Sequence, residues 1–132
     1  MFAASPPESV HALDPVALSN QSVTFWTARE NGVLLGCGAL KTFGTRQGEI
    51  KSMRTMPGAR GRGVATLVLA RIVDVARQRC YQRLWLETGS EQFFAPARSL
   101  YARNGFDVCG PFADYVPDPH SVFMSRVLDA NE

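Results

Sequence analysis

The stretch GEIKSMRTMPGARGRGVATLVLARIVDVARQR, from Gly48 to Arg79, decides the fold. Its first part, Glu49 to Thr55, alternates loosely between apolar and polar residues. This predicts a strand that ends before Pro57, because proline has no N–H to continue a ladder. From Val64 the apolar residues recur every three or four positions, which predicts a long amphipathic helix. The stretch therefore predicts a strand, a glycine-rich turn and a helix in immediate succession.

The turn between this strand and this helix has the composition of an anion site. Gly58, Gly61 and Gly63 let the backbone approach a ligand without Cβ atoms in the way. The free N–H groups at the start of a helix attract negative charge, and Arg60 and Arg62 stand beside them. No Lys-Ser/Thr pair follows the glycines, which argues against a kinase-type phosphate loop.

The run Arg60-Gly61-Arg62-Gly63-Val64-Ala65 resembles the phosphate loop of the GNAT superfamily of acyl-CoA-dependent N-acetyltransferases. That loop consists of Gln or Arg, two residues, Gly, one residue, and Gly or Ala. The segments Met53–Pro57, Leu84–Thr88 and Leu100–Phe106 (LYARNGF) resemble further parts of the family, in the same order. The resemblance covers roughly residues 23 to 127 and is more specific than the short loop alone.

The resemblance implies an α/β fold with a mixed, mostly antiparallel sheet flanked by helices, in a single acetyltransferase-like domain over residues 1–132. Strand-like runs at 23–28 and 33–42 are joined by a hairpin turn at Glu30-Asn31-Gly32. The strand at 83–88 should lie parallel to 49–55, because a helix connects them. A second helix at 95–104 and strands at 106–109 and 121–128 should complete the fold.

The same resemblance implies acetyl-CoA as cofactor. In the family the two central strands separate, and the acyl-pantetheine arm lies between them. The expected cofactor-binding residues are Met53, Arg54, Thr55, Arg60, Gly61, Arg62, Gly63, Val64, Ala65 and Thr66.

Acetyl transfer to an amine needs a group that accepts the proton of the amine and an acid that protonates the departing thiolate. Tyr101 matches the tyrosine acid of the family. Glu87 matches a position that some members use as base, and Glu49 is a rival candidate. Each of these residues could instead be structural: Tyr101 as a core aromatic, either glutamate as a carboxylate paired with an arginine.

Aromatic residues predict an apolar wall near the acceptor. Phe93, Phe94 and Tyr115 are the expected substrate residues. Phe94 also stands where many members carry an asparagine that contacts the cofactor arm. The alternative is that Phe93 and Phe94 anchor the second helix to the core, as paired aromatics commonly do.

The first 20 residues leave room for little more than one helix, whereas the family opens with a strand and two helices. The expected first strand is therefore missing: either the chain is a shortened member or its start is late. A missing strand would expose a sheet edge that can pair with another chain. We therefore expect a homodimer.

Composition fits a cytoplasmic globular protein, since no apolar run approaches the ~20 residues that span a bilayer. Cys37, Cys80 and Cys109 are widely spaced and suggest neither a disulfide framework nor a metal site. Nine basic residues stand against two acidic ones between Arg46 and Arg83. Without interleaved aromatic residues, this excess does not predict nucleic-acid binding.

These features predict an N-acetyltransferase that moves an acetyl group from acetyl-CoA to an amine of a small molecule or peptide by direct attack. The alternative is a catalytically silent acyl-CoA-binding sensor or regulatory module.

Overall fold

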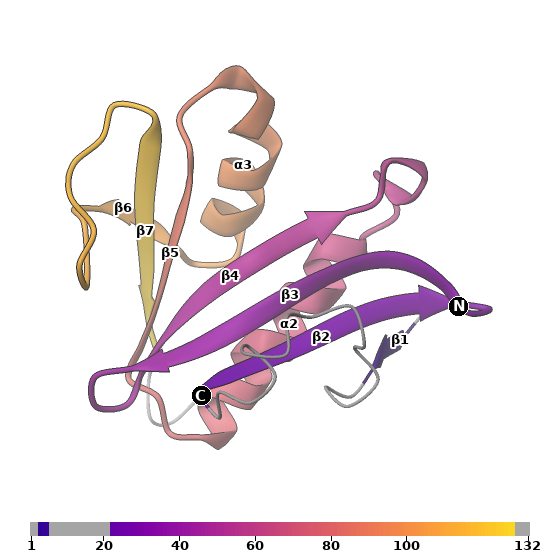
Figure 1. The fold of residues 1–132 in the computed structure, drawn as a ribbon, viewed down its shortest axis with the longest axis horizontal. Helices are drawn as coiled ribbons and strands as arrows, with labels where there is room; N and C mark the ends of the chain where they lie inside the picture. The colour runs from indigo at the N-terminus through magenta and orange to yellow at the C-terminus, as the bar shows by residue number, and fades with distance from the viewer. Residues whose placement is uncertain (1–2, 6–21, 129–132) are drawn as a thin grey trace.

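The computed structural model describes residues 3–5 and 22–128 (Figure 1). Seven strands within these ranges form one sheet in the order β1-β2-β3-β4-β5-β7-β6. Every neighbouring pair is antiparallel except β4 and β5, which are parallel. The strands are β1 (Ala3–Ser5), β2 (Val23–Glu30), β3 (Val33–Phe43), β4 (Gln47–Thr55), β5 (Arg83–Gly89), β6 (Asp107–Cys109) and β7 (Ser121–Val127).

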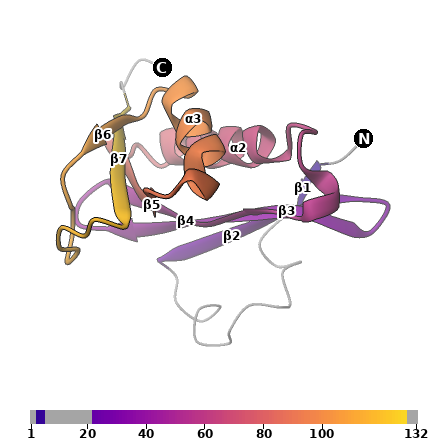
Figure 2. The same ribbon diagram turned by 90° about the horizontal axis from the view of Figure 1, so that it is seen from above.

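Two helices, α2 (Val64–Gln78) and α3 (Ala95–Arg103), lie on the same face of the sheet (Figure 2). Short 3-10 turns precede them, η2 (Pro57–Ala59) and η3 (Gln92–Phe94). Helix α2 is the crossover between the parallel strands β4 and β5, as the sequence pattern predicts. In the part of the chain that the structure describes, the other face of the sheet carries no helix.

The helix α2 packs on the sheet through the apolar stripe that its sequence predicts. Val68 and Ile72 are buried against the central strands. Gly38 of β3 makes this contact close, because a Cβ atom there would lie 2.8 Å from Val68 and 3.0 Å from Ile72. The sequence thus fixes both the helix and the strand surface that receives it.

The predicted fold class is confirmed, and the predicted strands and helices of residues 23–128 occur with small shifts at their ends. One expectation needs correction: the first strand is present as β1, which pairs with Thr27, Ala28 and Arg29 of β2. The one helix for which the first 20 residues leave room would fall within residues 6–21, which lie outside the described residues. No helix in residues 3–5 and 22–128 is long and apolar enough to cross a membrane.

Candidate active site

The hydrogen-bond ladder between the two parallel strands ends before the strands do. β4 pairs with β5 only from Gln47 to Ile50, although β4 continues to Thr55 and β5 to Gly89. Figure 1 shows the two strands diverging beyond this ladder, with α3 over the side where they separate. Backbone groups of β4 beyond Ile50 that face β5 therefore have no partner in that strand. An extended ligand could pair with them as an added strand would.

A bulge in β4 lies at the start of this gap. Between Cys37 and Ala39, β3 advances by two residues while its partner β4 advances by three, from Lys51 to Arg54. Ser52 adopts a φ of 57°, and its carbonyl oxygen lies 3.3 Å from the Cys37 thiol. A bulge bends a strand and increases its twist. The bulge therefore bends β4 just after its ladder with β5 has ended.

The glycine-rich turn leads directly into α2. Gly61 and Gly63 have φ values of 77° and 79°, a conformation that glycine adopts without strain. No side chain caps the helix start, and its first turn holds no acidic residue, so its N–H groups are open to an anion. The side chain of Val64 is buried, so this residue offers only its backbone N–H.

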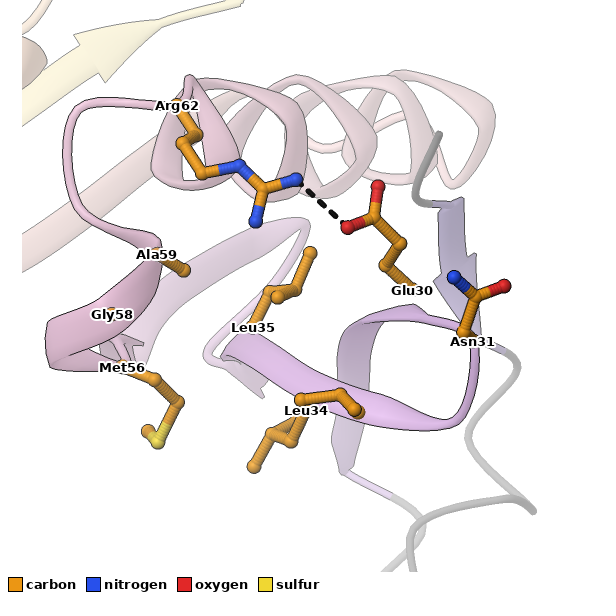
Figure 3. A pocket seen from close by; sticks show the side chains of 9 residues that line it. Glu30, Asn31, Leu34, Leu35, Met56, Gly58, Ala59 and Arg62 are labelled. Carbon is orange, nitrogen blue, oxygen red and sulfur yellow. Dashed lines mark hydrogen bonds and ion pairs between the residues drawn. The ribbon is translucent and has the colours of Figure 1, made fainter.

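The two arginines of this turn differ in their surroundings. Arg60 is exposed and has no ion pair with any residue that the structure describes. Arg62 lies 2.9 Å from Glu30, and this contact holds the pKa of the Glu30 carboxyl below its usual range. Figure 3 shows Arg62 reaching from the turn to Glu30 at the rim of a pocket. An anion that binds the turn therefore finds Arg60 available and competes with Glu30 for Arg62.

The pocket beside this ion pair has a volume of about 450 Å³ and lies between the β2–β3 hairpin and the glycine-rich turn. Leu34, Leu35 and Met56 give it an apolar lining.

Three residues expected to hold the cofactor arm lie at the end of β4. Met53 is half-buried and packs against the core on the side of α2. Arg54 is exposed and Thr55 is half-buried. All three belong to the part of β4 that has left the ladder with β5, so their backbone groups border the gap.

Tyr101 lies on α3, on the helical face of the sheet. It is 5% exposed, and its ring meets the edge of Phe106 with the centroids 5.8 Å apart. Burial raises the pKa of its phenol to about 12. Its hydroxyl makes no hydrogen bond with the residues that the structure describes. The group is therefore a neutral phenol at physiological pH.

The two candidate bases lie on the opposite face of the sheet. Gly48 and Ile50 face the helices and Glu49 lies between them, so alternation along the strand turns Glu49 away from the helices. Glu49 is 5% exposed and accepts a 2.5 Å hydrogen bond from the Tyr115 hydroxyl. Glu87 is exposed and accepts a 2.6 Å hydrogen bond from Ser121.

The aromatic residues expected near the acceptor occupy two separate places. Phe93, 71% exposed, stands edge-on to Phe94, and Phe94 packs against Gly89 at the end of β5. Tyr115 instead contacts Phe112 and Phe123, which belong to an aromatic cluster on the helix-free face. The members of this cluster are Phe43, Trp85, Phe112, Tyr115 and Phe123.

Sequence reasoning missed three side-chain contacts of the site. Tyr115 bonds Glu49 across 66 positions, Ser121 bonds Glu87 across 34, and Arg62 bonds Glu30 across 32. No local pattern in the sequence records such contacts, because the sheet topology brings the partners together.

The geometry and the comparisons with known proteins define the class. The model of the acetyltransferase (GNAT) family matches residues 2–106. The chain is 55% identical over 124 residues to the N-acetyltransferase YsnE of Bacillus subtilis, covering 94% of this chain and 82% of YsnE. It is 51% identical over 131 residues to the N-acetyltransferase YedL of Escherichia coli, covering 99% and 82%.

A solved structure agrees with these relatives. The acyl-CoA N-acyltransferase of Klebsiella pneumoniae superposes with a TM-score of 0.87 at 33% identity, covering 98% of this chain and 99% of that chain. The chain therefore belongs to the GNAT family of acetyltransferases. It is an N-acetyltransferase, and acetyl-CoA is its acetyl donor.

Proposed function

We propose that the acceptor amine attacks the thioester of acetyl-CoA directly, in the gap between β4 and β5. The ladder that stops at Ile50 and Leu86 carries this proposal, because it leaves strand backbone for the pantetheine arm. The cofactor phosphates bind the N–H groups from Gly61 to Thr66, together with Arg60 and Arg62. Met53 to Thr55 hold the arm through main-chain hydrogen bonds.

Tyr101 and Glu49 lie on opposite faces of the sheet, which supports a different proton transfer for each of them. Tyr101, on the helical face, protonates the coenzyme A thiolate as it leaves. Glu49, on the other face, accepts the proton of the attacking amine, and its burial favours it over the exposed Glu87. Acid and base on opposite sides of the reacting carbon can act on the leaving group and the nucleophile without neutralising each other.

We further propose a small-molecule or peptide amine as the acceptor, bound near Phe93, Phe94 and Tyr115. Residues 1–132 act as one acetyltransferase domain, in the cytoplasm and without nucleic acid or membrane as partner. A homodimer remains part of the proposal, although β1 already pairs with part of the β2 edge that motivated it. Light scattering that finds a monomer would remove the dimer.

Ligand-dependent melting tests cofactor binding, and turnover tests catalysis. A ligand that binds only the folded state raises its stability by RT ln(1 + [L]/Kd). Acetyl-CoA and free CoA should raise Tm at equal concentration, whereas ATP should not. Release of free CoA with a panel of amines then separates an enzyme from a silent acyl-CoA-binding module, which would melt higher with CoA but turn over no amine.

A further inference from the structure

Glu49 has surroundings unlike those of the other charged residues. Within the described part of the chain, it is the one charged residue that is buried. A buried carboxylate is costly unless hydrogen bonds compensate its lost hydration. The Tyr115 hydroxyl supplies such a bond to Glu49 Oε2 at 2.5 Å, in the range of strong, charge-assisted bonds.

The loop between β6 and β7 holds Tyr115 in this position. Phe112 is 6% exposed, and its ring packs 5.1 Å from that of Trp85, which anchors the loop to the helix-free face. A turn follows, in which the N–H of Tyr115 donates to the carbonyl of Phe112 at 3.0 Å. The Tyr115 ring then packs 5.0 Å from Phe112 and 5.6 Å from Phe123. Ring packing and a backbone bond thus orient the hydroxyl independently of Glu49.

These contacts make Tyr115 the accessible end of a two-residue chain. Glu49 is 5% exposed beneath the loop, whereas Tyr115 is half-buried and keeps contact with solvent. An amine that approaches from the helix-free face therefore meets the phenol oxygen before the carboxylate.

We propose that Tyr115 relays the proton of the attacking amine to Glu49. This inference rests on the proposed acetyl transfer and adds a residue to it. As the nitrogen bonds to the thioester carbon, it becomes cationic and gives a proton to the phenol oxygen of Tyr115. In the same step the phenol proton passes to Oε2 of Glu49. Tyr115 is neutral before and after, and the carboxylate ends as the acid.

The electrostatics of the loop agree with a neutral relay. Burial and the hydrogen bond to Glu49, with the negative charges of Glu49 and Glu87, raise the pKa of the Tyr115 phenol well above its usual range. Glu49 on β4 and Glu87 on β5 are the charged groups that act on this phenol. The phenol therefore keeps its proton at physiological pH and can accept a second only by releasing the first.

The test compares Tyr115→Phe, Glu49→Gln and the double variant in steady-state kinetics with acetyl-CoA and an amine that the wild-type enzyme acetylates. Each single variant should lower kcat about 100-fold or more, within the range for general acid–base groups, and leave the KM for acetyl-CoA unchanged. The double variant should be no more than about threefold worse than the slower single one, because both changes interrupt one chain.

Two variants keep the comparison sound. Glu49→Gln retains an oxygen that accepts from the Tyr115 hydroxyl, so it should fold even if the phenylalanine variant does not. Tyr81→Phe is the matched control, since it removes a phenol that bonds Thr42 on the helical side. Its kcat should stay near that of the wild type.

The outcomes separate the relay from the proposed function. A Tyr115→Phe enzyme with near wild-type kcat overturns the relay while acetyl transfer stands, and so does a double variant whose loss is the product of the two single losses. A lower Tm and a higher KM with unchanged kcat show a structural role and also overturn it. If the wild-type enzyme turns over no amine in the panel, the proposed function fails, and the relay fails with it.

The hydrogen bond itself can be tested without turnover. Absorbance titration of the tyrosines in alkaline solution should show one phenol that ionises at lower pH in Glu49→Gln than in the wild type. This phenol should disappear from the titration in Tyr115→Phe. A titration that Glu49→Gln leaves unchanged would contradict the coupling on which the relay depends.

Discussion

Replacing Tyr101 with phenylalanine should reduce activity and change the melting temperature little at neutral pH. The proposed acid gives its proton to the departing thiolate, and removal of such a group typically costs about 10²- to 10⁴-fold in rate. The loss should fall on kcat rather than on the KM for acetyl-CoA, because the phenol acts as the thiolate forms.

The stability change follows from the surroundings of the hydroxyl. Tyr101 is 5% exposed, and its hydroxyl bonds none of the residues that the structure describes. The hydroxyl oxygen is nevertheless not one of the buried side-chain atoms that lack a partner in the described residues, so it keeps access to water. Its removal should therefore change the unfolding free energy by less than about 0.5 kcal/mol, which for a chain of this length moves Tm by less than about 3 °C.

The dependence of the unfolding free energy on alkaline pH gives a second test of this substitution. In the folded state the pKa of Tyr101 is about 12, whereas a free tyrosine ionises near 10. The fold favours the neutral phenol, so this contribution is fully present below about pH 10 and is lost as pH rises toward 12. The Tyr101→Phe protein lacks the effect, and its stability should fall less steeply over that window.

Two measurements check this reasoning, a thermal melt at neutral and alkaline pH and a kcat for the same preparation. Tyr81→Phe, which loses a hydrogen-bonded phenol, should behave oppositely, with lower Tm and retained kcat. An unchanged kcat in Tyr101→Phe would exclude the acid role. A Tm lowered by several degrees would show that the hydroxyl has a bonding partner.

The remaining predictions concern the glycine-rich turn and the start of α3. Arg60→Ala should raise the KM for acetyl-CoA about tenfold and make this KM less dependent on salt concentration, because a charge-assisted contact to phosphate is lost. Arg71→Ala, on the exposed side of α2, should leave the KM and its salt dependence unchanged. Gly89→Val should destabilise the fold by about 1–3 kcal/mol in denaturant titration, since its Cβ would lie 2.1 Å from the Phe94 ring. Equal KM values for the two arginine variants, or a neutral Gly89→Val, would contradict these assignments.

The sequence could predict most of the central fold because its signals there are local. The glycines before Val64 and the apolar period after it place the start of α2 at Val64. The first strand was missed because β1 is only Ala3–Ser5, and its pairing depends on the neighbouring β2 rather than on its own residue types.

A motif in the sequence indicates the glycine-rich turn of the proposed site, whereas the side-chain contacts of that site leave no such signal. Residues 60–66 are contiguous, so a motif can reveal them. Glu49 and Tyr115 are 66 positions apart, and the loop that carries Tyr115 has no periodicity to indicate where its side chains point. The sequence offered Tyr115 as an acceptor-site residue and Glu49 as a base, but their connection exists only in the folded chain.

The gap between β4 and β5 lies where it does because each of these two strands is hydrogen-bonded to a different half of the sheet. On one side β4 follows β3 through to Thr55 and carries a bulge at Ser52. On the other side β5 pairs with β7 along its whole length, from Arg83 to Gly89, so it cannot follow β4. The backbone ladder between the two halves therefore ends at Ile50. A ligand with amide groups along an extended arm would bond to the separated strands as the missing part of the sheet, and its binding free energy would then stabilise the junction between the halves. This is the physical reason to expect coenzyme A to raise the melting temperature through its arm as well as through its phosphates.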